Sequence, residues 1–207
     1  MIFEHIVVGN MYTNCYILAD AKTKDALIID PGAEVGKIRA LLDRLNLRAR
    51  FIINTHGHID HIGGINDFNI PVYAHKYEKQ MFTSATKNLS SFLSQPFEAK
   101  VEFRPLIDGD KVSLGEITLK VIHTPGHTRG GICLLLLSPI TDVLFSGDTL
   151  FSGSIGRTDL EGASEEALLK SISEKILILP DKTVVYPGHG PKTTVGHEKK
   201  CNPFFCR

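Results

Sequence analysis

Three histidines and one aspartate lie within six positions of one another in the segment "NTHGHIDHIGG", residues 54 to 64. They are His56, His58, Asp60 and His61, and the apolar run "RARFII" precedes them. Imidazole and carboxylate groups are the protein ligands of zinc, iron and manganese. A solvated surface turn rarely gathers four such groups, so the spacing predicts a metal site.

Three later loops share one pattern, in which an apolar strand is followed by a glycine and one ligand-type residue. "VIHTPGHTRGG" presents His127, "VLFSGDTLF" presents Asp148 and "VVYPGHGP" presents His189. Glycine allows unusual backbone dihedral angles and a close approach of the chain. Each residue alone has an ordinary explanation, such as a turn for Asp148. Four separate loops would all need such explanations, which favours one shared metal centre.

The seven side chains are too many for one tetrahedral zinc ion. Divided between two ions, with one bridging carboxylate, they are the right number and leave room for a hydroxide. The remaining histidines, such as His5, His75, His123 and His197, stand alone beside turns and are more simply explained as surface or core residues.

Strands and helices must bring these loops together. Short apolar runs predict strands over 3–8, 14–20, 25–30, 48–54, 70–76, 110–116, 117–124, 131–137, 142–148 and 183–190. Helical spacing of apolar residues predicts helices over 33–46 and 164–179, the second with Ser164 as N-cap. The polar stretch 77–93 predicts a weakly amphipathic helix. Histidine-bearing loops follow strands in both halves, which indicates a layered α/β fold with its ligands at one edge.

Composition excludes several classes of function. The 207 residues are 43% hydrophobic, and Lys plus Arg balance Asp plus Glu at 23 each, so no net field attracts nucleic acid or an anionic membrane. The chain has no signal-peptide pattern and no membrane-spanning run. We expect a single domain over 1–207, a cytoplasmic location, and no nucleic-acid or membrane partner; the oligomeric state stays open. In that compartment Cys201 and Cys206 are expected to be free thiols rather than a disulfide.

The motifs "THGHIDH", "TPGHT", "SGDTLF" and "YPGHGP" together resemble the metallo-β-lactamase superfamily. The closest likeness is to its small glyoxalase II-like (hydroxyacylglutathione hydrolase-like) branch, and it extends from "TNCYIL" to "GHGPKTTVGHEKKCNPFF". This resemblance implies a four-layer αβ/βα sandwich with the metal site at one edge of the two sheets. It also implies two divalent metal ions per chain, zinc in the first place, with iron or manganese as alternatives.

The resemblance assigns a role to each matching residue. The first ion would bind His56, His58 and His127, and the second would bind Asp60, His61 and His189, with Asp148 as the bridge. Asp60 is also the expected catalytic residue, because it would orient the hydroxide. Asp30 of "IDPG" matches a position that buttresses a ligand from outside the site, although it could simply form the turn before Pro31. Arg157 of "IGRTD" either meets an anionic substrate group or pairs with Asp159.

Resemblance and chemistry together predict a hydrolase of small thioesters that uses a metal-bound hydroxide. A metal lowers the pKa of bound water to about 7 and stabilises the developing oxyanion. A thiolate with a pKa of about 8.5 needs little help to leave, whereas an amide nitrogen needs a general acid that the motifs do not offer. Full-length glyoxalase II enzymes add a C-terminal helical domain that grips glutathione. The chain stops about where that domain would begin, so we expect broad tolerance for thiol carriers.

Other branches of the superfamily fit less well. Zinc β-lactamases commonly have a cysteine, or no bridging ligand, at the position of Asp148, and they are exported. Flavodiiron proteins have glutamate at the position of His58, and the nucleic-acid-processing branches carry extra domains. The alternatives that remain are a mononuclear-iron persulfide dioxygenase, with ligands of the His56, His127 and Asp148 type, a small esterase or lactonase, and a metal-binding protein without catalysis.

Overall fold

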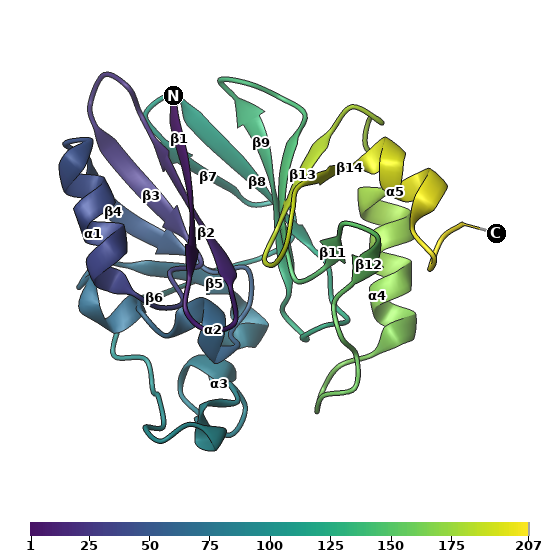
Figure 1. Ribbon diagram of the computed structural model, residues 1–207, viewed down its shortest axis with the longest axis horizontal. Helices are drawn as coiled ribbons and strands as arrows, with labels where there is room; N and C mark the ends of the chain where they lie inside the picture. The colour runs from purple at the N-terminus through teal and green to yellow at the C-terminus, as the bar shows by residue number, and fades with distance from the viewer. Residues whose placement is uncertain (207) are drawn as a thin grey trace.

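Two six-stranded sheets face each other in the computed structural model, which describes residues 1–206 (Figure 1). The first sheet has the order β1 (Ile2–Val8), β2 (Thr13–Ala19), β3 (Asp25–Ile29), β4 (Arg48–Ile53), β5 (Val72–His75) and β6 (Phe103–Leu106). The second has the order β14 (Thr193–Thr194), β13 (Val184–Pro187), β10 (Val143–Gly147), β9 (Ile132–Ser138), β8 (Ile117–His123) and β7 (Lys111–Leu114). A small hairpin is formed by β11 (Leu150–Phe151) and β12 (Ser154–Ile155).

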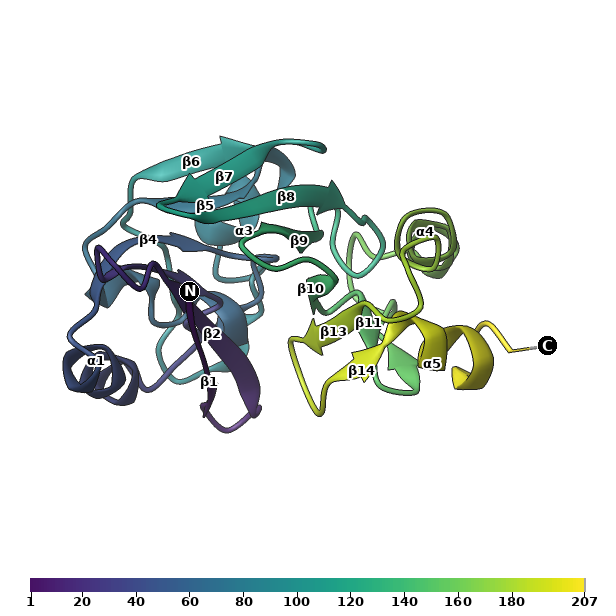
Figure 2. The same ribbon diagram turned by 90° about the horizontal axis from the view of Figure 1, so that it is seen from above.

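Helices cover the outer faces of the two sheets. Figure 2 shows α1 (Val35–Arg44) on the outer side of the first sheet, and α4 (Glu165–Ser171) and α5 (Val195–Cys201) on the outer side of the second. The predicted N-cap of α4 is confirmed, since Ser164 Oγ accepts a hydrogen bond from the Ala167 amide at 3.2 Å. The order helix, sheet, sheet, helix confirms the predicted four-layer αβ/βα sandwich.

Strand β2 illustrates how the core is built. All of its residues are buried, and successive side chains of a strand point to opposite faces. Ile17 therefore packs with Ile38 of α1 on one side. Leu18 packs with Leu119 and Phe145 of the second sheet on the other. A strand covered on both faces needs a continuous apolar run, which is what "CYILA" provides.

The predicted helix over 77–93 is wrong. Only α3 (Lys79–Phe82) is α-helical there, flanked by 3₁₀ turns at Lys76–Glu78 and Ser90–Phe92. Polar side chains compete for the backbone: Asn88 Oδ1 accepts from the Ser90 amide at 2.9 Å, and Ser84 Oγ accepts from the Lys87 amide at 3.4 Å. Such local bonds offer the chain an alternative to a continuous helix.

The sequence does not predict four of the strands: the two-residue strands β11, β12 and β14, and the longer β6. Strand β6 contains Pro105 and pairs only with β5, at the edge of its sheet. Proline cannot donate a ladder hydrogen bond, and an edge strand is the position where this does no harm.

The strand ends deliver the ligand loops to one edge of the sandwich. The first loop follows β4 and runs into α2 (Ile59–Ile62). Strands β10 and β13 are parallel neighbours, so the residues that follow them emerge side by side. None of the helices formed by residues 1–206 has the length and apolarity needed to cross a bilayer.

Candidate metal centre

All seven sequence-predicted ligands come together where the two sheets meet. They form three overlapping groups, in each of which the donor atoms lie within 4.8 Å of one another: His56, His58 and His127; His56, His61 and Asp148; Asp60, His61 and His189. The first sheet supplies one cluster of ligands, and the second sheet supplies one ligand from each of three loops. The centre is therefore a metal-binding His/Asp cluster shared by both sheets.

Asp148 lies between the other ligands. Its Oδ2 atom is 3.7 Å from His127 Nε2 and 3.6 Å from His189 Nε2, while its Oδ1 atom is 3.4 Å from His61 Nε2. A carboxylate in this position can reach ions bound on either side. Gly188 makes the approach feasible, because a Cβ atom there would stand 2.1 Å from Asp148 Oδ1.

In four of the histidines, the ring nitrogen Nδ1 contacts a protein oxygen outside the centre. The contacts of these Nδ1 atoms are His56 to Thr55 Oγ1 at 3.2 Å, His61 to Asp30 Oδ2 at 3.0 Å, His127 to the Arg157 carbonyl at 2.8 Å, and His189 to the Met11 carbonyl at 3.0 Å. A carbonyl can only accept, so the Nδ1 atoms of His127 and His189 carry the proton. Their Nε2 atoms are then free to ligate, and the rings are fixed in orientation.

The ring nitrogens that face the centre are placed to bind a metal ion. His56 Nε2 is buried without a hydrogen-bond partner, and His58 Nδ1 faces His127 Nε2 at 2.9 Å. Since His127 Nε2 carries no proton, it offers a lone pair toward the centre. A buried nitrogen without a partner is costly in a folded protein, and a cation between these atoms would remove the cost. The donor set therefore fits a divalent metal ion.

Electrostatics favour the same conclusion. Burial and the neighbouring His127 lower the pKa of His58 to about 3, and burial with the nearby His61 lowers the pKa of His56 well below its ordinary value. Burial opposes the charge on Asp60 and Asp148, yet the adjacent His61 lowers the pKa of both. Against the effect of burial, the same carboxylates raise the pKa of His61, and a bound cation would replace that proton. Ionised carboxylates, with neutral imidazoles as at His56 and His58, are the forms that bind metal.

Asp30 holds His61 from outside the centre. Its Oδ2 accepts from the Thr55 hydroxyl at 2.6 Å and lies 3.0 Å from His61 Nδ1, while its Oδ1 accepts from the Thr55 amide at 2.8 Å. The side chain is 2% exposed. Asp30 therefore does more than form the turn before Pro31, because it connects the "IDPG" turn to a ligand.

Arg157 pairs with Asp159. Its Nε and one terminal nitrogen donate to the two oxygens of Asp159 at 2.7 and 2.8 Å, and both side chains are exposed. Of the two roles expected for Arg157, the structure shows this pairing. Its backbone carbonyl has a separate role, since it accepts from His127.

Glu78 was not predicted from the sequence. Its carboxylate is fully buried, and its two oxygens accept from the amides of Gly57 and Gly130, both at 2.7 Å. These amides belong to the loop of His56 and His58 and to the loop that follows His127. Burial raises the pKa of Glu78 to about 7. No spacing in "AHKYEK" indicates this role, because both partners are distant in sequence.

The loop that carries His189 is held by strand β2. The Asn14 amide donates to the Gly188 carbonyl at 2.7 Å, and the Asn14 side chain donates to the carbonyls of Pro187 and Gly190 at 2.8 and 2.9 Å. The Tyr16 hydroxyl donates to the same Pro187 carbonyl at 2.7 Å. Thr13 of the same strand donates to Asp60 at 3.3 Å. The amino-terminal hairpin therefore fixes the second group of ligands.

With this fold and this ligand cluster, the chain belongs to the metallo-β-lactamase superfamily, whose family model matches residues 8–189. Among its relatives, "Probable metallo-hydrolase YqgX" of Bacillus subtilis is 39% identical, with 99% of this chain and 98% of the relative covered. "Hydroxyacylglutathione hydrolase GloC" of Haemophilus influenzae is 34% identical, with 99% and 98% covered. These relatives agree with the small glyoxalase II-like branch of the superfamily.

Solved structures show the same likeness over nearly the whole chain. The BLEG-1 B3 metallo-beta-lactamase has a TM-score of 0.90 at 40% identity, with 99% of each chain covered. TTHA1623 in a di-iron-bound form has a TM-score of 0.81 at 34% identity, covering 97% of this chain and 99% of that one. ETHE1 from Myxococcus xanthus has a TM-score of 0.78 at 29% identity, covering 98% and 84%.

Proposed function

We propose that the protein is a binuclear metallohydrolase that cleaves small thioesters, in the manner of a hydroxyacylglutathione hydrolase. One observation carries the proposal: a second group of ligands, Asp60, His61 and His189, converges beside the first, with Asp148 between the two. A mononuclear centre with ligands of the His56, His127 and Asp148 type would leave Asp60, His61 and His189 without an ion to bind. The 34% identity to a relative described as a hydroxyacylglutathione hydrolase supports the thioester substrate.

The ligands are divided between two ions in this proposal. His56, His58 and His127 would hold the first ion, Asp60, His61 and His189 the second, and Asp148 both. Zinc is the first candidate. Iron or manganese suits the same donors, because metal availability often decides occupancy. The similarity to TTHA1623, which is described in a di-iron-bound form, supports two ions.

The chain's own residues would then position the reaction. Bound ions supply water that ionises near pH 7 and a Lewis acid for the substrate carbonyl. Asp60 Oδ2 accepts from Thr13 Oγ1 at 3.3 Å and lies 3.1 Å from His189 Nε2, while the side chain stays 12% exposed. Its other oxygen can accept a hydrogen bond from the attacking water and orient it. The thiolate leaves without a proton donor, since its pKa is about 8.5.

The wider assignments belong to the same proposal. We infer that residues 1–207 act as one domain on a small-molecule thioester in the cytoplasm, without a nucleic-acid or membrane partner. The charge balance of 23 basic against 23 acidic residues supports the absence of a polyanionic partner.

Hydrolysis of β-lactams is a second candidate. The sequence argued against zinc β-lactamases, but a chain described as a B3 metallo-beta-lactamase is 40% identical and has a TM-score of 0.90. An amide nitrogen needs a proton as it leaves, and the motifs offer no free general acid. We therefore rank this reaction below thioester hydrolysis.

Metal analysis combined with parallel assays tests the proposal. We expect about two ions per chain and turnover of a lactoyl thioester, with His197→Ala as a control that removes a histidine outside the centre. One iron per chain with oxygen uptake on glutathione persulfide would favour the dioxygenase. Faster cleavage of a β-lactam than of any thioester would favour the second candidate. Full metal loading without turnover would indicate binding alone.

A further inference from the structure

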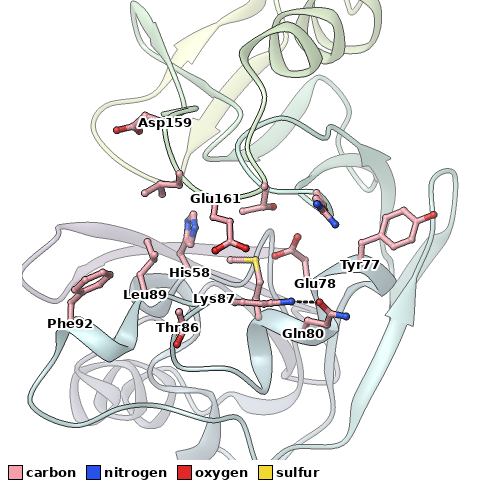
Figure 3. A pocket seen from close by; sticks show the side chains of 15 residues that line it. His58, Tyr77, Glu78, Gln80, Thr86, Lys87, Leu89, Phe92, Asp159 and Glu161 are labelled. Atoms are coloured by element: carbon pink, nitrogen blue, oxygen red, sulfur yellow. Dashed lines mark hydrogen bonds between the residues drawn. The ribbon is translucent and has the colours of Figure 1, made fainter.

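A pocket opens beside the first group of ligands. It has a volume of about 340 Å³, and His58 forms part of its wall. Figure 3 shows Leu89 and Phe92 on one side of the pocket and Tyr77 on the other, with His58 between them. Its volume lies at the lower end of the range for small-molecule sites. A substrate held at the metal centre can extend into this space directly.

The apolar wall of the pocket is built and held in place. Leu89 has a φ of +69°, a left-handed conformation that a leucine rarely adopts. The buried Asn88 fixes it, because its side-chain amide donates to the carbonyls of Met81 and Phe97, both at 3.0 Å. The Asn88 carbonyl accepts from the Ile59 amide at 2.9 Å, inside the "HGHIDH" motif. Strain of this kind persists where the surrounding structure enforces it, often at a binding site.

The charges around the pocket do not suit a carrier with several carboxylates. Lys87, Arg129 and Glu161 line it, and two further acidic residues there are already engaged, because Asp159 is ion-paired with Arg157 and both oxygens of Glu78 accept from amides. Lys87 is already hydrogen-bonded to Gln80 (Figure 3). A glutathione group would therefore find few unpaired cations for its two carboxylates. An uncharged apolar group meets no such penalty.

The opposite side of the centre is open. There the Met11 carbonyl holds His189, and the side chains of Met11 and Tyr12 are 60% and 72% exposed. A thioester has two arms, one on each side of the carbonyl–sulfur bond. The centre therefore offers one arm a pocket with an apolar wall and the other an exposed surface.

We infer that the pocket beside His58 selects the acyl arm of the substrate, and that it favours an apolar acyl group larger than lactoyl. The thiol arm lies over the open side and is selected weakly. This inference rests on the proposed thioester hydrolysis and adds the class of acyl group. Burial of each additional methylene should raise kcat/KM about fourfold, from the ~0.8 kcal/mol that a buried CH₂ contributes, until the pocket is full.

Two substrate series on the metal-loaded protein test the assignment. The first varies the acyl group from acetyl to octanoyl on N-acetylcysteamine, and adds benzoyl. The second keeps the acyl group and varies the thiol from ethanethiol to glutathione. We expect a steep rise with acyl length and less than a tenfold spread among thiols. A flat acyl series, with thioesters still hydrolysed, overturns this inference alone. Failure to hydrolyse any thioester overturns the proposed function and this inference with it.

Variants of the wall show which arm occupies the pocket. Thr86→Trp should fill the space, so the ratio of octanoyl to acetyl efficiency should fall at least tenfold. Phe92→Ala removes an 84% exposed side chain at the rim and should flatten the acyl series. Phe204→Ala is the matched control, since it truncates an exposed phenylalanine beyond α5 and should leave the series unchanged. If Thr86→Trp alters the thiol series and not the acyl series, the assignment of the arms is wrong.

Discussion

Replacing Glu78 by glutamine tests the buried link between the two loops of the first ligand group. The carboxylate accepts two amide hydrogen bonds, from Gly57 and Gly130, and has no cationic partner among them. Glutamine keeps the shape of the side chain but cannot ionise. One of its two terminal groups is an NH₂ donor, which can no longer accept from an amide. The variant should therefore change both the pH dependence of stability and the geometry of the loops.

The pH effect follows from the raised pKa. Burial moves the pKa of Glu78 from its ordinary 4.5 to about 7 in the folded protein, so the folded state holds the proton more tightly than the unfolded state. The stabilisation from that proton is complete below about pH 4.5 and is lost as the pH rises through about 7. Each tenfold change in an ionisation constant is worth about 1.4 kcal/mol, so the loss is about 3 kcal/mol. Glutamine has no such loss.

Urea unfolding of the metal-free protein between about pH 5 and pH 8 measures this difference. At about pH 5 the wild type should be as stable as Glu78→Gln, or more stable by up to about 1 kcal/mol, because the variant loses one hydrogen-bond acceptor. By about pH 8 the difference in unfolding free energy between the two proteins should have shifted by about 3 kcal/mol in favour of the variant. Parallel stability curves would show that Glu78 does not ionise with a raised pKa, and the reasoning would fail.

Metal binding gives a second measurement on the same variant. A looser Gly57–Gly130 link should lower the affinity for the first ion roughly 10- to 100-fold, the usual effect of losing a group that supports the ligands. Glu198→Gln is the control, because Glu198 is also fully buried and accepts from the Gly153 amide at 2.9 Å. That position lies outside the ligand loops, so metal affinity should remain at the wild-type value. Equal losses in the two variants would point to general destabilisation instead.

Four further substitutions examine the centre itself. Asp148→Asn removes the charge shared by both groups of ligands, so metal analysis should show the second ion lost first, with a parallel fall in rate; retention of both ions and full activity would refute the bridge. His61→Ala should weaken the second ion and His127→Ala the first, and thioesterase activity should fall by a similar, near-total amount in both; a large loss only in His127→Ala would favour a mononuclear enzyme. Asp30→Asn leaves His61 less firmly oriented and should weaken the second ion roughly 10- to 100-fold in a chelator competition, with little change at the first.

The ligands could be predicted from the sequence because their pattern is local. His56, His58 and His61 share one loop, and His127 and His189 each follow an apolar strand and a glycine. The same local signals, together with the resemblance, predicted the sandwich. The residues that hold the ligands in position could not be predicted in this way. Their roles depend on contacts between residues that are far apart in the sequence.

Glu78 shows the difference. It is 21 positions from Gly57 and 52 from Gly130, and its role exists only once the loops are folded together. The helix predicted over 77–93 is wrong for a related reason. Thr83, Ser84 and Ser90 bind the backbone locally through their hydroxyl groups. Asn88 binds Met81 and Phe97 in place of a helical pattern.

The hydrogen bonds between strand β2 and the His189 loop also determine when the centre can be completed during synthesis. The hydrogen-bond partners of Asn14 and Tyr16 lie 171 to 176 residues further along the chain, at Pro187 and Gly190. Closing so long a loop costs entropy that is recovered only when those contacts form. On the ribosome, His56, His58 and His127 emerge well before His189, so the site for the first ion can assemble while the second is still missing a ligand. We expect nascent chains halted before residue 187 to capture one ion, and the hairpin to become protected from proteolysis only after the last strands are released.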